Sequence, residues 1–248
     1  MSEQGETRLP AGTGAFPETR WTRVVALQSD DEDSSREALS ELCHLYWPPL
    51  YSYFRRHGRE PADAQDLTQG LFEQLISRES LRRADVQKGK LRTFLLAAAN
   101  NYLISQHRRE TRQKRGGDTI AVSLDAEEAE SFHVRAGAFD DLTPEKLFDR
   151  QWATVTLDSV RAALAREYAS RGREKHFAVF QQFLSWNESD SPYREAAVEA
   201  GLSEEALRVA VVRMRKRFRI LLRESIADTL YQGEDIDGEI RHLFAAFG

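Results

Sequence analysis

The amino-acid sequence predicts an all-α protein of two small helical domains joined by an acidic linker. Only seven prolines and fourteen glycines occur in 248 residues, and helix-favouring alanine, leucine, glutamate and arginine are common. Apolar residues recur at helical spacing along most of the chain, whereas alternation with a period of two is confined to residues 119–124. Charge is also segregated, because a basic stretch is followed at once by an acidic one.

Bulk composition describes a soluble protein with a substantial core, since 41% of the residues are hydrophobic and 30% are charged. The single cysteine, Cys43, excludes an intrachain disulfide and fits a reducing cytosol. No run approaches eighteen apolar residues, and the N-terminus has no apolar signal core. We therefore expect a cytoplasmic protein without a membrane partner.

The first domain should occupy residues 16–117, after a disordered arm over residues 1–15. A short amphipathic helix is expected near Trp21. A longer helix is predicted over residues 36–56, which Pro48-Pro49 should kink or divide. The histidine and glycine that follow should end it.

The next helix is predicted to run from Pro61 to about Ser77, with its proline in the first turn. Its spacing buries an apolar stripe that includes Phe72. Acids and amides, among them Asp66 and Gln69, are expected to stay outside.

The most informative stretch is KGKLRTFLLAAANNYLISQHRRETRQKR (88–115), in which eight basic residues and one glutamate give a net charge of +7. Leu91, Leu95 and Ala98 fall on one helical face, so we expect a helix that docks through this face and ends at Gly116-Gly117. Its amides and arginines are then left for a negatively charged, structured partner. The alternative interpretation is a solvated basic helix end, which is the usual meaning of a charge run.

Residues 118–143 are predicted to be an acidic linker. Nine acids and two basic residues lie between positions 118 and 149, with few apolar anchors. A short helical piece is expected near residues 126–132. The acidic composition explains how a chain with a net charge of −5 can still carry two basic regions.

The second domain should occupy residues 144–230, and Thr143-Pro144 forms a plausible helix start. Within it, a short helix ends at Gly201, and Ser203 caps a longer helix rich in arginine. This order predicts a helix–turn–helix motif that binds duplex DNA, although a purely structural pair of core helices has a similar pattern. The tail over residues 231–248 is amphipathic. It is expected to complete the core, or else to cover the second helix of the motif.

Three blocks in this order resemble a bacterial RNA polymerase sigma factor of the extracytoplasmic-function group in the sigma-70 family: ADAQDLTQGLFEQL (62–75), KLRTFLLAAANNYLISQHRR (90–109) and YREAAVEAGLSEEALRVAVVRMRKRFRILLRE (193–224). The resemblance covers most of the chain. It implies core RNA polymerase, through its β′ clamp helices and β flap, and promoter DNA as partners. An anti-sigma factor or a regulatory kinase is the implied regulator.

The resemblance also implies roles for individual residues. Those expected to bind the −10 promoter element are Lys90, Arg92, Asn100, Asn101, Gln106, Arg108 and Arg109. Those expected to bind the −35 element are Ser203, Arg208, Val212, Arg213, Arg215 and Arg217. Those expected to bind the polymerase are Asp66, Gln69 and Phe72.

Two departures from the family pattern bear on these roles. Gly70 stands where an acid is usual, and Glu205 stands where glycine is usual at the base-reading end of the second helix. No glycine-rich phosphate loop or Ser–His–Asp signature occurs, so we expect no enzymatic activity, no cofactor and no metal. The competing hypothesis is a helix–turn–helix regulator that binds duplex DNA without polymerase.

Overall fold

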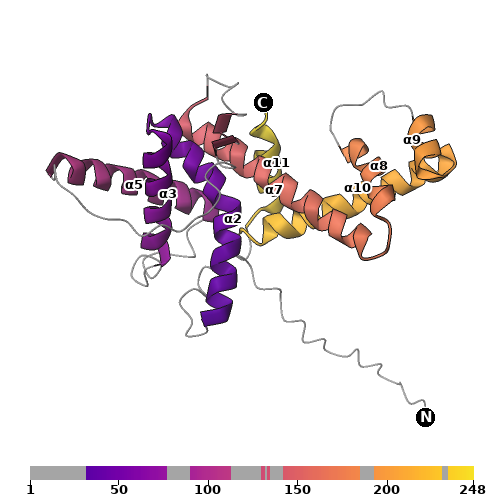
Figure 1. Cartoon of the computed structure of the whole chain (residues 1–248), viewed down its shortest axis with the longest axis horizontal. Helices are drawn as coiled ribbons and strands as arrows, with labels where there is room; N and C mark the ends of the chain where they lie inside the picture. Colours follow the sequence, from indigo (N-terminus) through magenta and orange to yellow (C-terminus); the bar gives the residue numbers. More distant parts are fainter. Residues whose placement is uncertain are drawn as a thin grey trace, which may run out of the picture.

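A computed structural model of the protein describes residues 32–76, 90–112, 130–131, 133–134, 142–184, 193–230 and 234–248. All regular structure in these ranges is helical, which confirms the predicted all-α fold. The helices form an elongated assembly with N-terminal helices at one end and α8 and α9 at the other (Figure 1). The expected arm, the helix near Trp21 and loop 81–89 lie outside the described residues.

Three long helices build the N-terminal end: α2 (Glu32–Arg56), α3 (Pro61–Ile76) and α5 (Leu91–Arg112). The predicted division of the first helix is wrong, because α2 is one helix that contains both Pro48 and Pro49. After α2 the chain turns at Gly58, whose φ of 77° is a left-handed conformation that glycine adopts without steric cost.

The rest of the chain adds α7 (Pro144–Ala169), α8 (Glu174–Phe180), the 3₁₀ helix η2 (Gln181–Leu184), α9 (Tyr193–Ala200), α10 (Glu204–Ala227) and α11 (Ile236–Ala245). The predicted start of the second helical block is confirmed. The Thr143 side chain accepts a hydrogen bond from the backbone N–H of Lys146 at 3.3 Å, and Pro144 occupies the first turn. This cap satisfies a helix N–H that would otherwise have no partner within the helix.

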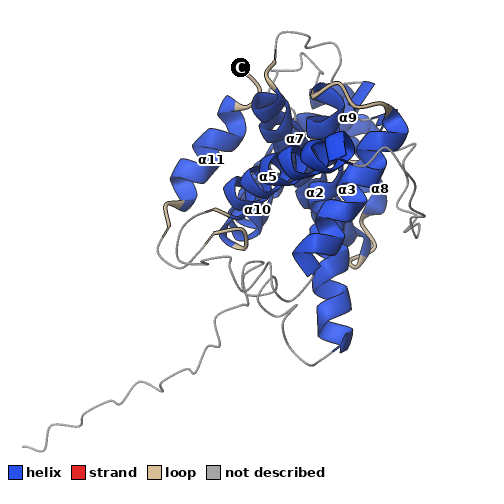
Figure 2. Ribbon diagram, turned by 90° about the vertical axis from the view of Figure 1, so that its left-hand side faces the viewer, coloured by secondary structure: helices blue, strands red, loops and turns tan. Residues whose placement is uncertain are grey.

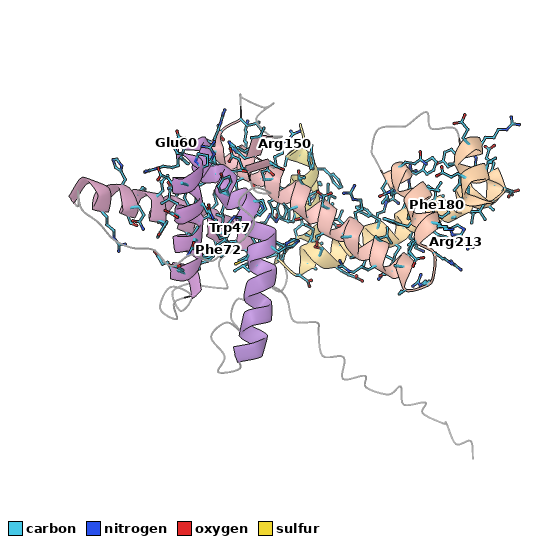
Figure 3. All side chains as sticks on the ribbon, in the orientation of Figure 1. Trp47, Glu60, Phe72, Arg150, Phe180 and Arg213 are labelled. Atoms are coloured by element: carbon cyan, nitrogen blue, oxygen red, sulfur yellow. The ribbon has the colours of Figure 1, made fainter. Side chains whose placement is uncertain are left out.

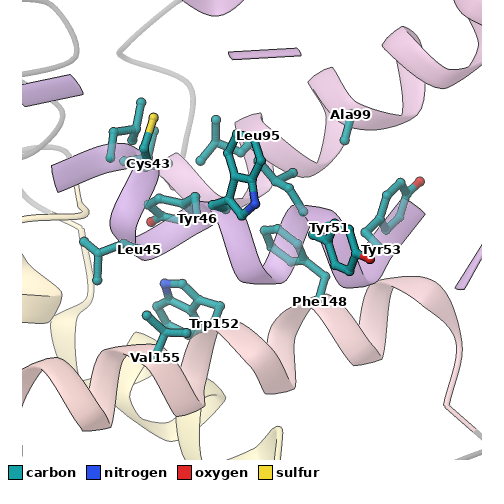
Figure 4. Packing of buried hydrophobic residues seen from close by; sticks show 14 of the residues in the cluster. Cys43, Leu45, Tyr46, Tyr51, Tyr53, Leu95, Ala99, Phe148, Trp152 and Val155 are labelled. Atoms are coloured by element: carbon teal, nitrogen blue, oxygen red, sulfur yellow. The ribbon is translucent and has the colours of Figure 1, made fainter. Parts of the chain in front are cut away.

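The larger hydrophobic core joins both halves of the chain. Figure 4 shows Phe148, Trp152 and Val155 of α7 facing side chains of α2 such as Tyr46 and Tyr51. The same core contains residues of α3 and α5 and, from the C-terminal end, of α10 and α11. In this arrangement the acidic linker does not separate two independent cores.

A smaller core holds the distal end together. Its buried residues come from the end of α7, from α8 and η2, and from α9 and the first half of α10. Because α7 and α10 contribute to both cores, these two helices connect the ends of the molecule. Figure 2 shows α11 at the side of this bundle, where it contacts α7 and α10.

Candidate nucleic-acid interface

The distal end contains a helix–turn–helix made by α9 and α10. Gly201 forms the turn with a φ of 65°, which a residue with a side chain would adopt only with strain. The Ser203 hydroxyl then caps α10 by accepting a hydrogen bond from the backbone N–H of Ala206 at 3.2 Å. The predicted turn at Gly201 and the predicted cap at Ser203 are therefore confirmed. The Ser203 side chain stabilises the start of α10 whether or not it also contacts DNA.

The first half of α10 presents polar and apolar side chains to solvent. Arg208 forms an ion pair with Glu204 at 2.7 Å, and its guanidinium lies 4.3 Å from the centre of the Tyr193 ring. Val212 is 64% exposed, and Arg213 is also exposed. An exposed surface with fixed cations and apolar groups is suited to phosphates, base edges and thymine methyl groups.

Arg215 and Arg217 hold α10 to the rest of the fold. Arg215 donates a hydrogen bond to the Phe183 carbonyl oxygen at 2.8 Å. Arg217 forms a bidentate ion pair with Glu167 of α7, at distances of 2.6 and 3.0 Å. The hydrogen bond from Arg217 holds the pKa of Glu167 below its ordinary value. Both arginines therefore have a structural role in addition to the predicted contact with DNA.

A cavity of about 470 Å³ lies beside this helix, between α7, α8 and α10. Apolar side chains such as Tyr168 and Phe180 line it, together with Arg171, Arg173 and Arg213. Figure 3 places Phe180 and Arg213 close together at the distal end of the molecule. The basic turn between α7 and α8 was not among the predicted site residues, because only the fold brings it next to α10.

The helix α5 carries the other predicted DNA surface. Asn100, Asn101, Arg108 and Arg109 are exposed, and Gln106 is half-buried. Asn101 and Arg108 are seven positions apart and so lie on one face of the helix. The C-terminal half of α5 extends beyond α3, at the end of the molecule opposite α9 (Figure 1). The two exposed basic surfaces thus face solvent at opposite ends of one elongated molecule.

Lys90 and Arg92, at the start of α5, lie apart from that surface. Arg92 contacts Glu239 of α11 at 2.5 Å and Asp149 of α7 at 3.0 Å. Lys90 also forms an ion pair with Glu239. The structure therefore splits the predicted −10 residues into an exposed group and a pair that is covered by carboxylates.

The predicted polymerase-binding residues are not all accessible. Asp66 is exposed, whereas Gln69 and Phe72 are only 5% and 3% exposed. The Phe72 ring stacks on Trp47 with 5.7 Å between ring centres (Figure 3). The expectation that Gln69 stays outside is wrong, because both α2 and α5 contact α3 and widen its buried face. The other exposed polar side chains of this helix are Asp63, Glu73 and Gln74.

Three further findings concern metal binding, the cysteine and membrane insertion. In the described part of the chain, no three His, Cys, Asp or Glu side chains gather in a way that could hold a metal ion. Cys43 is buried, and its burial raises the pKa of the thiol to about 11. None of the described helices has the length and hydropathy needed to cross a membrane.

Comparison with known proteins gives one family match. Residues 42–113, which include α3 and α5, match the family model of sigma-70 region 2. No curated protein and no solved structure matches the chain. The region 2 match covers less than a third of the chain and lies over α3 and the basic helix α5.

Proposed function

We propose that this protein is a sigma factor of the extracytoplasmic-function group, which directs core RNA polymerase to promoters with −10 and −35 elements. The region 2 match on the basic helix α5 is the observation that carries the proposal. The helix–turn–helix at the other end of the molecule supports it, because a bipartite promoter needs two separate DNA-binding surfaces.

During promoter opening, as we propose it, α5 binds the unpaired −10 strand. Basic side chains follow the backbone of a single strand, and amides such as those of Asn100 and Asn101 can bind bases that have left the stack. No covalent step is required. Strand opening is stabilised because the protein binds the single-stranded state better than the duplex.

The −35 element is assigned to the first half of α10. Arg208 and Val212 have the exposure that contact with base edges in the major groove requires. Arg213 lies next to the basic turn with Arg171 and Arg173, and we assign phosphate contacts to these three arginines.

Polymerase binding through the β′ clamp helices is assigned to the exposed acidic face of α3 around Asp66. The buried pair of Phe72 and Trp47 supports this face from inside rather than contacting the partner. The β flap, an anti-sigma factor and a regulatory kinase remain part of the proposal through the family resemblance.

The test is association with core RNA polymerase, followed by promoter-dependent run-off transcription. Asp66→Ala should weaken association by about tenfold or more if this carboxylate is central to the contact, while binding to −35 duplex is unchanged. Asp158→Ala, which removes a partly exposed carboxylate of α7 that pairs with Arg161, is the control and should behave like wild type. Phe72→Ala is unsuitable, since it would damage the core.

Failure of the purified chain to bind core polymerase at low ionic strength would contradict the proposal. If that chain still bound duplex DNA, the polymerase-independent helix–turn–helix regulator would take its place. A regulator of that class would usually bind as a dimer to two half-sites, which sedimentation of the DNA complex would reveal.

A further inference from the structure

The start of α5 is covered by the C-terminal helix α11. Both Glu239 oxygens face Arg92, with Nε at 2.5 Å from Oε1 and Nη2 at 3.4 Å from Oε2. Lys90 shares the same carboxylate. The Glu239 side chain is only 1% exposed and that of Arg92 only 12% exposed. A phosphate cannot reach Arg92 while this carboxylate is in place.

Neighbouring contacts hold the carboxylate where it is. Arg92 also forms an ion pair with Asp149 and lies over the Trp152 ring at 5.5 Å. On the other side of the cluster, His242 of α11 lies 3.1 Å from Asp149. Leu243 of α11 is fully buried in the larger core. The helix is therefore seated by apolar burial, and its acid is directed at two cations.

A buried carboxylate is costly unless cations and hydrogen bonds compensate it. Burial alone would raise the pKa of Glu239, but hydrogen bonds from Arg92 and Lys90 outweigh that effect and hold the pKa below its ordinary value. Glu239 is thus charged at neutral pH. An anion in this position satisfies the same cations that the sequence assigns to DNA.

We propose that Lys90 and Arg92 form an anion-binding site that Glu239 fills in the free protein and that a phosphate of single-stranded DNA fills in the promoter complex. In this scheme α11 is an intramolecular competitor of the −10 strand. The inference rests on the proposed function only in assigning the −10 strand to α5.

Competition of this kind needs a ligand with several contacts. Glu239 acts at the high effective concentration of an attached group, so an isolated phosphate would compete poorly. A DNA strand that also binds Arg108 and Arg109 on the exposed part of α5 would bring its backbone to the same helix repeatedly. Such a strand can displace Glu239 because each added phosphate contact adds to its affinity.

The test measures binding of a fluorescein-labelled twelve-nucleotide thymidine strand by fluorescence anisotropy at low ionic strength. Glu239→Gln keeps the shape of the side chain and removes its charge, so we expect affinity to rise about tenfold, which corresponds to about 1.4 kcal/mol. Asp237→Asn is the matched control. It removes the same charge from the same helix, but at an exposed ion pair with Arg223. Its effect should stay within about twofold, as for a distant rim charge.

Dependence on Arg92 separates the competitor from a general charge effect. In the Arg92→Ala/Glu239→Gln double variant, the gain in affinity for the thymidine strand that Glu239→Gln produces should disappear. Equal gains in Glu239→Gln and Asp237→Asn, or a gain that persists without Arg92, would overturn the inference.

A second measurement uses the wild-type chain and so does not depend on how the variants fold. Amide hydrogen exchange in residues 236–245 should speed up at least about threefold when the thymidine strand is bound at saturation, because α11 loses its ionic anchor. Unchanged exchange in α11 with DNA fully bound would also overturn the inference.

The outcomes distinguish this inference from the proposed function. A chain that supports promoter-dependent transcription but shows no Glu239 effect remains a sigma factor without the competitor. A chain that shows the Glu239 effect but does not bind core polymerase retains the competitor and loses the sigma assignment.

Discussion

At the scale of single residues, Gly70 explains how α3 and α5 approach each other. A Cβ atom at this position would lie 2.2 Å from the Tyr102 hydroxyl oxygen and 3.2 Å from the ring carbon that bears it. Burial raises the pKa of Tyr102, in keeping with a phenol held between the two helices. The absence of an acid at position 70, a departure from the family pattern, therefore leaves room for a side chain of α5.

We predict that Gly70→Ala destabilises the protein. Alanine favours a helix by about 1 kcal/mol over glycine, but an overpacked contact costs about 1–3 kcal/mol. Tyr102→Phe removes the oxygen at 2.2 Å, so the double variant should lose less stability than the two single variants together. Urea denaturation of the four proteins measures this. A Gly70→Ala variant more stable than wild type would show that Tyr102 moves away without cost.

Glu239 gives a pH dependence with a defined sign. Its pKa is lower in the folded state than the ordinary value of 4.5, so its contribution to stability is present above about pH 4.5 and is lost as pH falls through the folded value. The groups around it are Lys90, Arg92 and the pair of Asp149 with His242. We predict that the stability difference between wild type and Glu239→Gln is largest near pH 7 and shrinks below pH 4.5. Thermal melts across this range would contradict the prediction if the difference did not change.

At the scale of elements, local signals in the sequence predicted the helices well. Thr143, Gly201 and Ser203 have short-range roles, as caps and a turn, that follow from residue type alone, and all three are found in these roles. Of the two effects expected of the proline pair, division of the helix is wrong, because α2 is held by a face that is buried on both sides of the prolines. Tertiary packing outweighs local helix propensity in such a case.

The candidate site was less predictable because its residues depend on contacts between distant segments. Arg217 and Arg92 look equivalent to Arg208 in the sequence, as basic residues on amphipathic helices. Only the fold pairs Arg217 with Glu167 and Arg92 with Glu239. No periodicity in one helix can predict which charge a helix far along the chain will supply.

The caps of α7 and α10 give a prediction that separates folding from DNA binding. Ser203→Ala and Thr143→Ala each remove a side chain that caps a long helix, and each should cost about 1 kcal/mol of stability. Of these two residues, only Ser203 lies on the DNA-binding surface that we assign to the first half of α10. We therefore expect Ser203→Ala alone to weaken −35 duplex binding, measured by anisotropy at a temperature where both variants are folded. Equal binding by the two variants would remove Ser203 from the DNA surface.

At the scale of the whole molecule, the larger hydrophobic core extends across the domain boundary that the acidic linker suggested. The division into domains over residues 16–117 and 144–230 stays a prediction, and the described contacts run across it. The helices α2 and α7 contact each other extensively, and one hydrophobic core contains Phe148 and Trp152 beside the residues of α2. The linker also takes part, since Glu130 accepts hydrogen bonds from Arg55 at 3.1 Å. The two surfaces proposed to bind the promoter are thereby held at opposite ends of a shared framework.

This arrangement predicts that the N-terminal half is not stable alone. A fragment of residues 1–117 would expose the apolar side chains of α2 that contact α7, at a cost of about 25 cal/mol per Å² of apolar surface. We expect this fragment to melt at a lower temperature than the full chain and to bind a hydrophobic dye. Trp152→Ala in the full chain should have a related effect, costing about 3–5 kcal/mol, because the indole is almost fully buried in the shared core. Val212→Ala, at an exposed position, is the control and should be nearly neutral. A fragment that unfolds cooperatively at the melting temperature of the full chain would instead establish residues 1–117 as an independent domain, and the contact with α7 would then contribute little to its stability.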